Sequence, residues 1–430
     1  MASIIDTTVI NLDVVPAYKP ISFYVTNSVP NDVRQISAEV YINGTLRATV
    51  YTDKVIVNYG AGFFSFLIDI SAPVRDYLSF MLLAYGTGNE TVDNLAQARV
   101  NVNIFEWYVD ATSGLLTKNS VHVATWDSFI ALNATRQGNE LTTLARHMQG
   151  NGTLEGLPFT NRPTNPSNIK MKLGESEFLG IYADAASHYM VLCFDSTGTP
   201  ISGGIRTFSA FTVHGGIRSN ATRQLGVGAE NINNSTFATW FNGLPLPLID
   251  ENVKYYFIGW GIPFTFFGLE LFQGTFMRYT MAKSGRCNSV RFHWFNRYGE
   301  PDAYSFQKFT DLTQDSSPDR YEKPLINTVS GSTIVTPSYS SRGVSILKSD
   351  NEIKFEIESF ILNETEALWL SEMASSPEVY IEDVDYLGNI INVPVAMDKN
   401  KVDLVEDKDT GFVTVKMKGS YARMIESQTT

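Results

Sequence analysis

Histidine and carboxylate residues are the side chains of this 430-residue chain that could act in catalysis or metal binding. Asp184 and His188 are four positions apart, so they would share one face of a helix. The residues between them favour a turn joining two strands, and we therefore expect an exposed loop pair and no site. The histidines show no spacing typical of a metal site: they are His122, His147, His188, His214 and His293.

Acidic residues form two clusters. The first contains Glu382, Asp383 and Asp385, and the second contains Asp403, Glu406, Asp407 and Asp409. Neither cluster matches an EF-hand loop, so we expect solvated carboxylates in turns. The possibility of a carboxylate pair for glycoside hydrolysis stays open, because its two residues can be far apart in sequence.

Serine-hydrolase, zinc-protease and P-loop motifs do not occur. We predict no catalytic residue, no cofactor and no metal site, and a chain that is not an enzyme.

Basic residues are concentrated in one run, which contains Arg278, Lys283, Arg286, Arg291 and Arg297 and no acidic residue. Such a run could face DNA or an acidic neighbouring subunit, and the alternative is that it forms the polar outer face of strands. The net charge of the chain is −12, so we expect no nucleic acid partner. The candidate interaction residues are Arg218, Arg223, Arg278, Arg286 and Arg291.

Aromatic and sulfur-containing side chains give two further sets of candidates. Trp240, Phe241 and Trp260 could stack on sugars, although packing in a core is the favoured interpretation. Cys193 and Cys287 both lie in apolar segments, and we expect two buried thiols. A disulfide between them stays open, because its geometry cannot be judged from sequence.

The element that must position many of these side chains is a predicted hairpin over residues 289–306. Apolar residues alternate with polar ones on both sides of a turn at 296–302, which is the pattern of two half-buried strands. Gly299 provides the positive φ that such a turn needs. We expect Trp294 and Phe306 to be core residues.

The composition predicts a mainly β fold, with several β-sandwich-like (immunoglobulin-like) modules and a small C-terminal α+β module. We expect an N-terminal sandwich-like domain over 1–106, with a hairpin at Asn43-Gly44 and a short helix capped by Ser71. The other predicted segments are a mixed connector over 107–166, a central β domain with the aromatic hairpin over 167–325, and the α+β module over 326–430.

Smaller features are expected within these segments. The connector has weak helical spacing over 126–148 and a proline-containing linker at 161–166, and the central domain has an exposed polar loop over 215–235. Asn363 and Glu366 form a capping box before a helix in the last module. The first residues lack the pattern of a signal peptide, and the apolar stretch 255–277 contains too many helix breakers to cross a bilayer.

Three sets of segments together resemble a known group of proteins. They are 16–23 with 40–44 and 69–78, then 157–163, and then Phe295-Asn296-Arg297-Tyr298-Gly299 with 302–306. In this order they are similar to virion proteins of tailed phages of Bacteroidetes, the crAss-like phages among them. The resemblance implies a tail, collar or baseplate component that assembles as a ring or cluster. Its motifs contain no catalytic residue.

The function that follows is a structural virion protein that works through contacts between subunits. Its expected partners are other copies of itself and neighbouring tail or portal-proximal proteins, and its expected location is the virion after synthesis in the host cytoplasm. A receptor-binding or glycan-binding protein of the tail tip, with a host-surface glycan as partner, remains an alternative. A tail-associated hydrolase is a further one.

Overall fold

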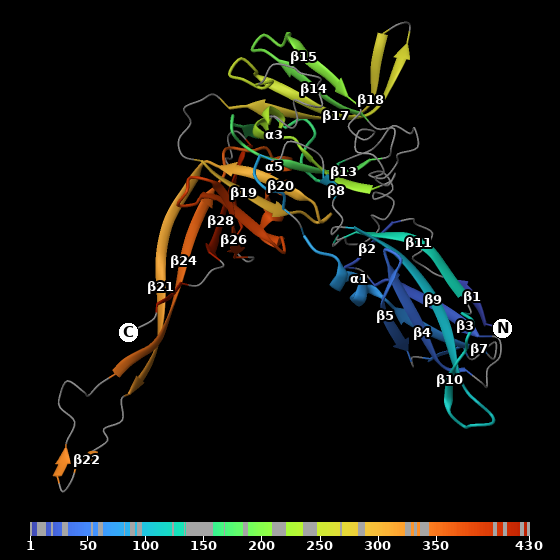
Figure 1. The fold of residues 1–430 in the computed structure, drawn as a ribbon. Helices are drawn as coiled ribbons and strands as arrows, with labels where there is room; N and C mark the ends of the chain where they lie inside the picture. Colours follow the sequence, from blue (N-terminus) through green and yellow to red (C-terminus); the bar gives the residue numbers. More distant parts are fainter. Residues whose placement is uncertain are drawn as a thin grey trace. The chain divides into compact units, whose positions relative to one another are not determined.

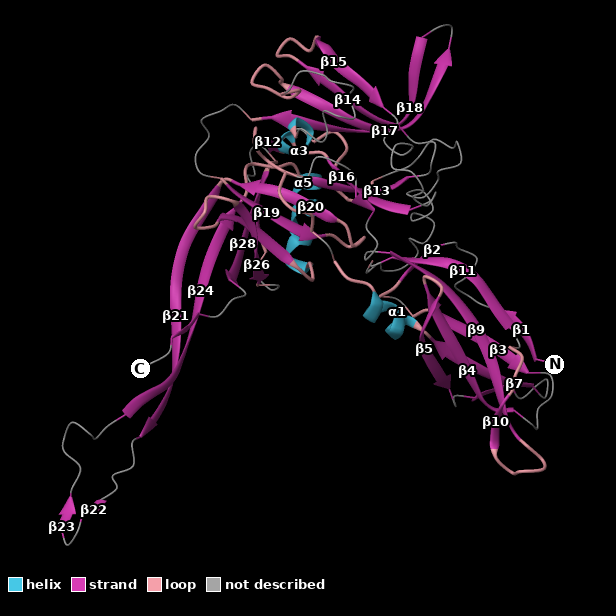
Figure 2. Cartoon of the chain, viewed as in Figure 1, coloured by secondary structure: helices cyan, strands magenta, loops and turns pink. Residues whose placement is uncertain are grey.

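The structure is a computed structural model of a mainly β protein whose strands form several sheets (Figures 1 and 2). It describes residues 2–6, 14–18, 20–27, 33–52, 55–58, 63–80, 82–86, 91–92, 97–122, 124–132, 134, 158–166, 168–183, 188–208, 221–234, 247–266, 269–282, 289–322, 328–330, 333–335, 344–398, 402–406, 411–421 and 425–427. The mainly β fold class that the composition predicts is confirmed.

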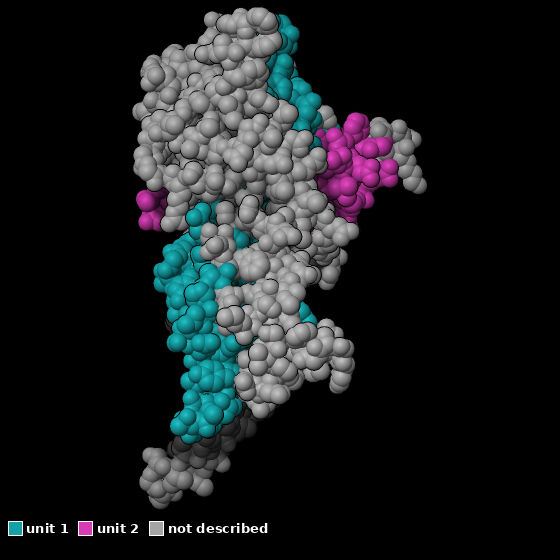
Figure 3. Space-filling view, turned by 90° about the vertical axis from the view of Figure 1, so that its right-hand side faces the viewer, with its two compact units in different colours: residues 1–285, 295–303 teal, residues 286–294, 304–430 magenta. Residues whose placement is uncertain are grey.

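Two compact units make up the chain, and Figure 3 colours them separately. Unit 1 contains residues 1–285 and 295–303, and unit 2 contains residues 286–294 and 304–430. The tip of the hairpin over 289–306 is therefore counted with unit 1, whereas most of its two strands belong to unit 2.

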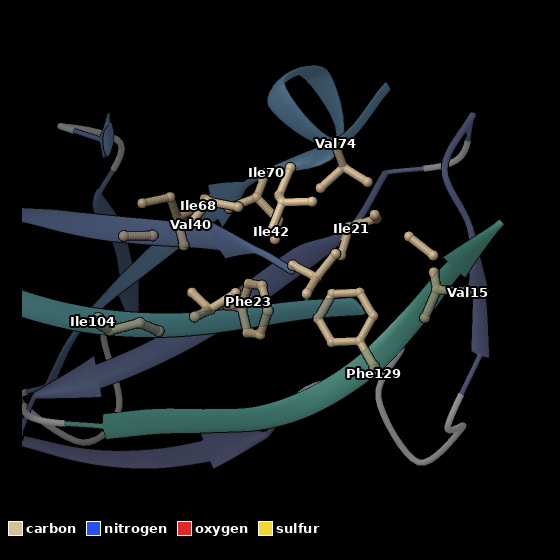
Figure 4. Packing of buried hydrophobic residues seen from close by; sticks show 14 of the residues in the cluster. Val15, Ile21, Phe23, Val40, Ile42, Ile68, Ile70, Val74, Ile104 and Phe129 are labelled. Carbon is tan, nitrogen blue, oxygen red and sulfur yellow. The ribbon is translucent and has the colours of Figure 1, made fainter. Parts of the chain in front are cut away.

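The N-terminal part of unit 1 is a β-sandwich, as predicted. One sheet contains β1 (Ala2–Asp6), β3 (Ser22–Asn27), β7 (Phe63–Asp69) and β6 (Val55–Asn58). The other contains β2 (Val14–Pro16), β11 (Ala124–Leu132), β9 (Gln97–Val109), β4 (Val33–Ile42), β5 (Thr45–Thr52) and β10 (Leu116–Lys118). Apolar side chains from both sheets, including Phe23, Val40 and Phe129, fill the space between them (Figure 4).

Local sequence explains the connections of this sandwich. Asn43 and Gly44 have φ values of 50° and 80°, which confirms the predicted hairpin turn between β4 and β5. Helix α1 (Ser71–Tyr77) also forms as expected, but its cap differs. The carboxylate of Asp69 accepts hydrogen bonds from the backbone N–H groups of Ser71 and Ile21, at 2.9 and 3.0 Å. Ser71 is the first helical residue, so it does not cap the helix.

The second part of unit 1 contains two further sheets. One is made of β12 (Lys170–Met171), β18 (Leu269–Met281), β17 (Tyr255–Phe266), β14 (His188–Phe194) and β15 (Pro200–Phe208). The other is made of β13 (Phe178–Ala183), β16 (Ala221–Gly226) and β8 (Thr91–Val92), and helix α3 (Ala229–Asn233) follows β16. Their shared core includes Ile181, Leu225, Tyr256 and Tyr279.

Unit 2 is built on one large sheet. Its order is β20 (Pro301–Phe306), β19 (Val290–Phe295), β25 (Val379–Val384), β26 (Ile390–Met397), β28 (Val413–Tyr421), β24 (Val344–Glu358) and β21 (Lys308–Glu322). Strand β27 (Asp403–Glu406) pairs with β28, β29 (Ile425–Ser427) pairs with β24, and β22 (Thr328–Ser330) pairs with β23 (Thr333–Val335). Helix α5 (Glu364–Ser371) has the predicted capping box of Asn363 and Glu366.

Trp294 and Phe306 are core residues, as predicted: neither side chain is exposed. The Trp294 ring lies 5.2 Å from the ring of Trp369 on α5. The hairpin as a whole differs from the expected half-buried form, because the residues of β20 and nearly all those of β19 are buried on both faces. Its polar residues therefore do not face solvent.

One turn occurs three times with the same geometry, and each copy connects two antiparallel strands. The segments are 195–199, 296–300 and 385–389, which share an Asp or Asn at the first position and a Gly at the fourth. The glycines have φ values between 80° and 86°. In each turn the side-chain oxygen of the first residue accepts hydrogen bonds from the N–H groups two and four positions later. The side chain of the first residue and the positive φ of the glycine thus together determine the conformation of the loop.

Several predicted boundaries differ from the observed elements. Strand β21 pairs with β24 along its length, so the boundary drawn between 325 and 326 falls within one sheet. Residues 124–132 of the connector form β11, and most of the segment 133–148 lies outside the described residues. In the proposed linker 161–166, Arg162 is buried and ion-paired with Glu177, whereas Thr164 and Asn165 are exposed.

Candidate functional site

Only two of the five candidate arginines have described side chains. Arg218 and Arg286 lie outside the described residues, and Arg223 lies on β16, where its side chain is not described. Arg278 lies on β18 in unit 1, whereas Arg291 lies on β19 in unit 2. Those that are described have separate environments.

Arg291 is buried in a polar cluster of unit 2. Its Nη1 donates a hydrogen bond to Ser305 Oγ at 3.0 Å, and its Nε lies 3.9 Å from Glu382 Oε1. The same carboxylate oxygen lies 2.6 Å from Nε2 of His293. Arg291 on β19 lies opposite Glu382 on the neighbouring strand β25, because the two strands are antiparallel and Phe292 pairs with Ile381. Arg291 is therefore a buried residue and not an exposed interaction residue.

Arg278 is held at the surface of unit 1 by neutral partners. Its guanidinium lies 4.3 Å from the ring centroid of Tyr255, and its Nη1 donates to Asn165 Oδ1 at 3.3 Å. Arg297 is arranged similarly, with hydrogen bonding to Asn161 and stacking on Tyr298. The basic run is thus divided between buried and stacked arginines, and its described part does not present one continuous basic face.

The polar stretch 215–235 is not a single exposed loop. Residues 221–226 form β16, which pairs with β13, and Gln224, Leu225 and Gly226 are buried. Residues 229–233 form α3, in which Asn231 is buried and accepts hydrogen bonds from the N–H groups of Gly228 and Glu177. The expectation of an exposed loop is therefore wrong for 221–233. Residues 215–220 lie outside the described residues, as does Ser235.

The histidine and carboxylate candidates are dispersed. Asp184, His147 and His214 lie outside the described residues, His188 begins β14, and His122 is exposed. Asp385 is tied into its turn by the N–H groups of Leu387 and Asn389. The side-chain amide of Asn389 and these N–H groups lower the pKa of Asp385. Asp383 is exposed, and Asp403 and Glu406 lie on β27, where both are exposed. Among the described residues, no group of three or more His, Cys, Asp or Glu is placed to hold a metal ion.

Cys193 is a buried free thiol on β14, as predicted. Burial raises its pKa to about 12, and the nearby Asp250 contributes to the same shift. Cys287 lies outside the described residues, as do Trp240 and Phe241. Trp260 lies on β17 opposite Tyr189 and Thr275, and its side chain is not described. The sugar-stacking alternative for these aromatics therefore stays a prediction.

The long ribbon of β21 and β24 is the most unusual surface feature of unit 2, and Figure 1 shows the two strands running side by side. Each strand has 15 residues, and their pairing continues from Lys308 with Glu358 to Glu322 with Val344. Strands in globular proteins usually have three to ten residues, and 15 residues span about 50 Å. The ribbon was not predicted, because many of its residues are polar and do not alternate with apolar ones.

Other strands support only the proximal part of this ribbon. Strand β28 pairs with residues 354–358 of β24, and β29 pairs with residues 349–351. In the described part of the chain, residues 344–348 pair with β21 alone, and β21 is the edge strand of its sheet. The distal ribbon is therefore a two-stranded hairpin, which is marginally stable in water without further contacts.

Two ordered hairpin tips expose large apolar side chains. At the β25–β26 turn, Tyr386 is 94% exposed and Leu387 is 68% exposed. At the β9–β10 turn, Leu115 is 67% exposed, and the Asp110 carboxylate accepts hydrogen bonds from the N–H groups of Thr112 and Ser113. Ordered, exposed apolar tips are typical of surfaces that contact other molecules.

Comparisons with known proteins add no assignment: no protein-family model matches the chain, and a search of curated proteins finds no match. In the described residues, no helix has the length and apolar character needed to span a bilayer. The ribbon and the exposed tips are accordingly the features on which a functional proposal must rest.

Proposed function

We propose that the chain is a structural component of a tailed-phage virion, in the tail, collar ring or baseplate, and that it acts through contacts between subunits. The observation that supports this proposal most directly is the β21–β24 ribbon. The segments that resemble phage virion proteins support it independently.

The physical argument starts from the stability of the ribbon. A two-stranded hairpin buries little apolar surface, and ordering each backbone residue costs about 1–2 kcal/mol at 25 °C. The distal pairs of β21 and β24 have no third strand or helix of unit 2 against them among the described residues. A neighbouring subunit that covers the ribbon would supply the missing contacts and would stabilise the long hairpin.

The edge of the ribbon indicates how such contacts are made. Pro318 lies within β21 and removes one backbone donor, and two register shifts occur, at Asp311/Gln314 and at Asp319/Arg320. Proline and bulges are features that protect an edge strand against pairing with further strands. We therefore assign the contacts to the side chains on the faces of the ribbon, and not to strand addition along β21.

Receptor or glycan binding at a tail tip is the second candidate, and the β25–β26 tip favours it. The turn holds the Tyr386 ring in solvent, and exposed aromatic rings are suitable for stacking on sugars. Binding of the purified chain to a panel of bacterial surface glycans, lost in Tyr386→Ala and kept in Tyr51→Ala, would favour this function. The second tyrosine is also exposed but lies on β5 in the sandwich.

The structural role is tested by removing the distal ribbon. Residues 314–353, which begin and end at the register pair Gln314–Ile353, are replaced by Asn-Gly, so that the proximal pairs with β28 remain. We expect this variant to fold but to be absent from purified particles assembled with it in place of the native chain, as measured by quantitative mass spectrometry. A matched control replaces the exposed β9–β10 tip, residues 111–114, by Asn-Gly. Normal incorporation of the ribbon variant would contradict the proposal.

A further inference from the structure

An exposed group of arginine and tyrosine side chains lies around α1 at one end of the N-terminal sandwich. The Arg47 guanidinium lies 5.1 Å from the ring centroid of Tyr77, and the Arg75 guanidinium lies 5.9 Å from that of Tyr18. Arg99 on β9 is also exposed, and we include it because its backbone is bonded to Asn43, which contacts Tyr77. We call the three arginines and the two tyrosines the arginine–tyrosine surface.

Hydrogen bonds connect this surface to the β4–β5 turn. Asn43 Nδ2 donates to the Tyr77 hydroxyl at 3.1 Å, and Asn43 Oδ1 accepts from the backbone N–H of Arg99 at 3.1 Å. The backbone N–H of Asn43 also donates to the Arg99 carbonyl at 2.8 Å. The turn thus holds Tyr77 and Arg99 in fixed positions, and Tyr77 in turn supports Arg47.

The three arginines are exposed, and none of them forms an ion pair with a carboxylate of the described residues. Asp69, which precedes α1, accepts hydrogen bonds from the N–H groups of Ser71 and Ile21. A stacked guanidinium keeps its edge N–H donors available, and these match the geometry of a carboxylate. Arginine and tyrosine are also enriched among the residues that dominate binding energy at protein interfaces.

A sugar is a poor occupant for this surface, because the guanidinium groups of Arg47 and Arg75 lie over ring faces on which a sugar would stack. A nucleic acid is also a poor occupant, because the chain as a whole has a net charge of −12. Two guanidiniums that lie over tyrosine rings, together with the exposed Arg99, fit an acidic protein segment.

The same chain contains such a segment in the β21–β24 ribbon. Residues 311–322 and 344–354 of the ribbon contain six acidic residues and three basic ones. The register places Asp315 opposite Glu352, and it places Asp319 opposite Lys348. The excess of acidic residues gives this part of the ribbon a negative charge, which a basic surface would complement.

We propose that the acidic ribbon of one copy docks on the arginine–tyrosine surface of a second copy. The contact would be heterologous, with a different surface contributed by each copy, so that repetition gives a ring when the rotation closes. This inference rests on the proposed structural function and deepens it, because it names the two surfaces through which the copies meet.

Charge reversal tests the pairing in the full chain. One variant carries Arg47→Glu, Arg75→Glu and Arg99→Glu, and the other carries Asp315→Arg, Asp350→Arg and Glu352→Arg. Each variant alone should self-associate at least about tenfold more weakly than the native chain in sedimentation velocity over a concentration series. An equimolar mixture should recover association, because each ribbon then meets a surface of opposite charge in the other variant. Circular dichroism and thermal unfolding establish that both variants are folded.

A charge-reversal control carries Lys172→Glu and Lys254→Glu, which belong to neither surface, and it should associate as the native chain does. Native association that neither reversal weakens, or a mixture that does not recover, would overturn this pairing while leaving the particle-incorporation test of the structural function unaffected. A native chain that is monomeric at every concentration would also overturn the pairing, and particle incorporation would then decide the function separately.

Discussion

The side-chain amide of Asn296 donates a hydrogen bond to the carboxylate of Asp302, with 3.1 Å between Nδ2 and Oδ2. The same nitrogen donates to the Phe159 carbonyl at 2.8 Å, while Oδ1 accepts from the N–H of Tyr298 at 2.9 Å. Thr160 Oγ1 donates to the same Asp302 oxygen at 2.8 Å. Of the three equivalent turns, this one is buried and has the neutral amide, whereas the turns at Asp195 and Asp385 are exposed or nearly so and have a carboxylate.

Replacing this amide by a carboxylate should therefore be costly. Asn296→Asp removes two donated hydrogen bonds and places a second carboxylate next to Asp302 in a buried site, so we expect a loss of about 3 kcal/mol or more in the free energy of unfolding. Urea denaturation measures the change. The matched control is Asp385→Asn, which makes the reverse exchange in an exposed turn and should alter the transition far less. Equal effects would mean that burial does not determine the turn residue.

Trp294 should be among the most sensitive positions of unit 2. Its indole is fully buried and packs at 5.2 Å against Trp369, so Trp294→Ala should lower the free energy of unfolding by about 3–5 kcal/mol. The control is Tyr386→Ala, which truncates an aromatic side chain that is almost fully exposed in the same unit. A thermal transition that Trp294→Ala does not shift would contradict the assignment of Trp294 to the core.

Alternation in the sequence predicted the hairpin over 289–306, its turn and its core residues correctly. It failed for the polar face, because it treats Arg291 and His293 as solvent-facing. In the structure both are buried, and the carboxylate of Glu382, from a strand about 90 residues later, lies next to Nε of Arg291 and Nε2 of His293. A buried ion pair of this kind depends on a distant partner, and periodicity within one segment contains no information about that partner.

Other parts of the fold could be predicted from the sequence because they depend on residues that are close together in the chain. The Asn43-Gly44 turn and the capping box at Asn363 are determined by residues within four positions, so their chemistry is visible in sequence. The arginine–tyrosine surface was not visible, because Arg47, Arg75 and Arg99 are separated by some 25 residues each and meet only when the sandwich forms. Strand β16 was missed because glycine- and asparagine-rich composition normally indicates a loop.

Cys193 should be inert in the native protein. Burial raises its pKa to about 12, so the reactive thiolate is scarcely populated at neutral pH. In a Cys287→Ser variant, which leaves Cys193 as the single thiol, labelling by a thiol reagent at pH 8 should be slow without denaturant and at least about a hundredfold faster in 6 M guanidinium chloride. Rapid labelling of the folded variant would show that the β14 environment opens readily.

Glu106 on β9 should make the stability of the N-terminal sandwich depend on pH. Desolvation raises the pKa of this carboxyl above its ordinary value of 4.5, because burial penalises the ionised form. The folded state therefore binds the proton more tightly than the unfolded state. The contribution of Glu106 to stability is therefore most favourable below pH 4.5, and it becomes less favourable as the pH rises through the interval up to the raised pKa. Glu106→Gln removes the charge, so it should raise the free energy of unfolding at pH 7 and leave it nearly unchanged at pH 4.

The neighbouring Asp110→Asn provides a control of opposite sign. The N–H groups of Ser113 and Thr112 lower the pKa of Asp110, so that variant should lose stability at pH 7. Urea titrations at both pH values measure the changes, and a Glu106→Gln gain of the same size at pH 4 would show that packing and not ionisation is responsible.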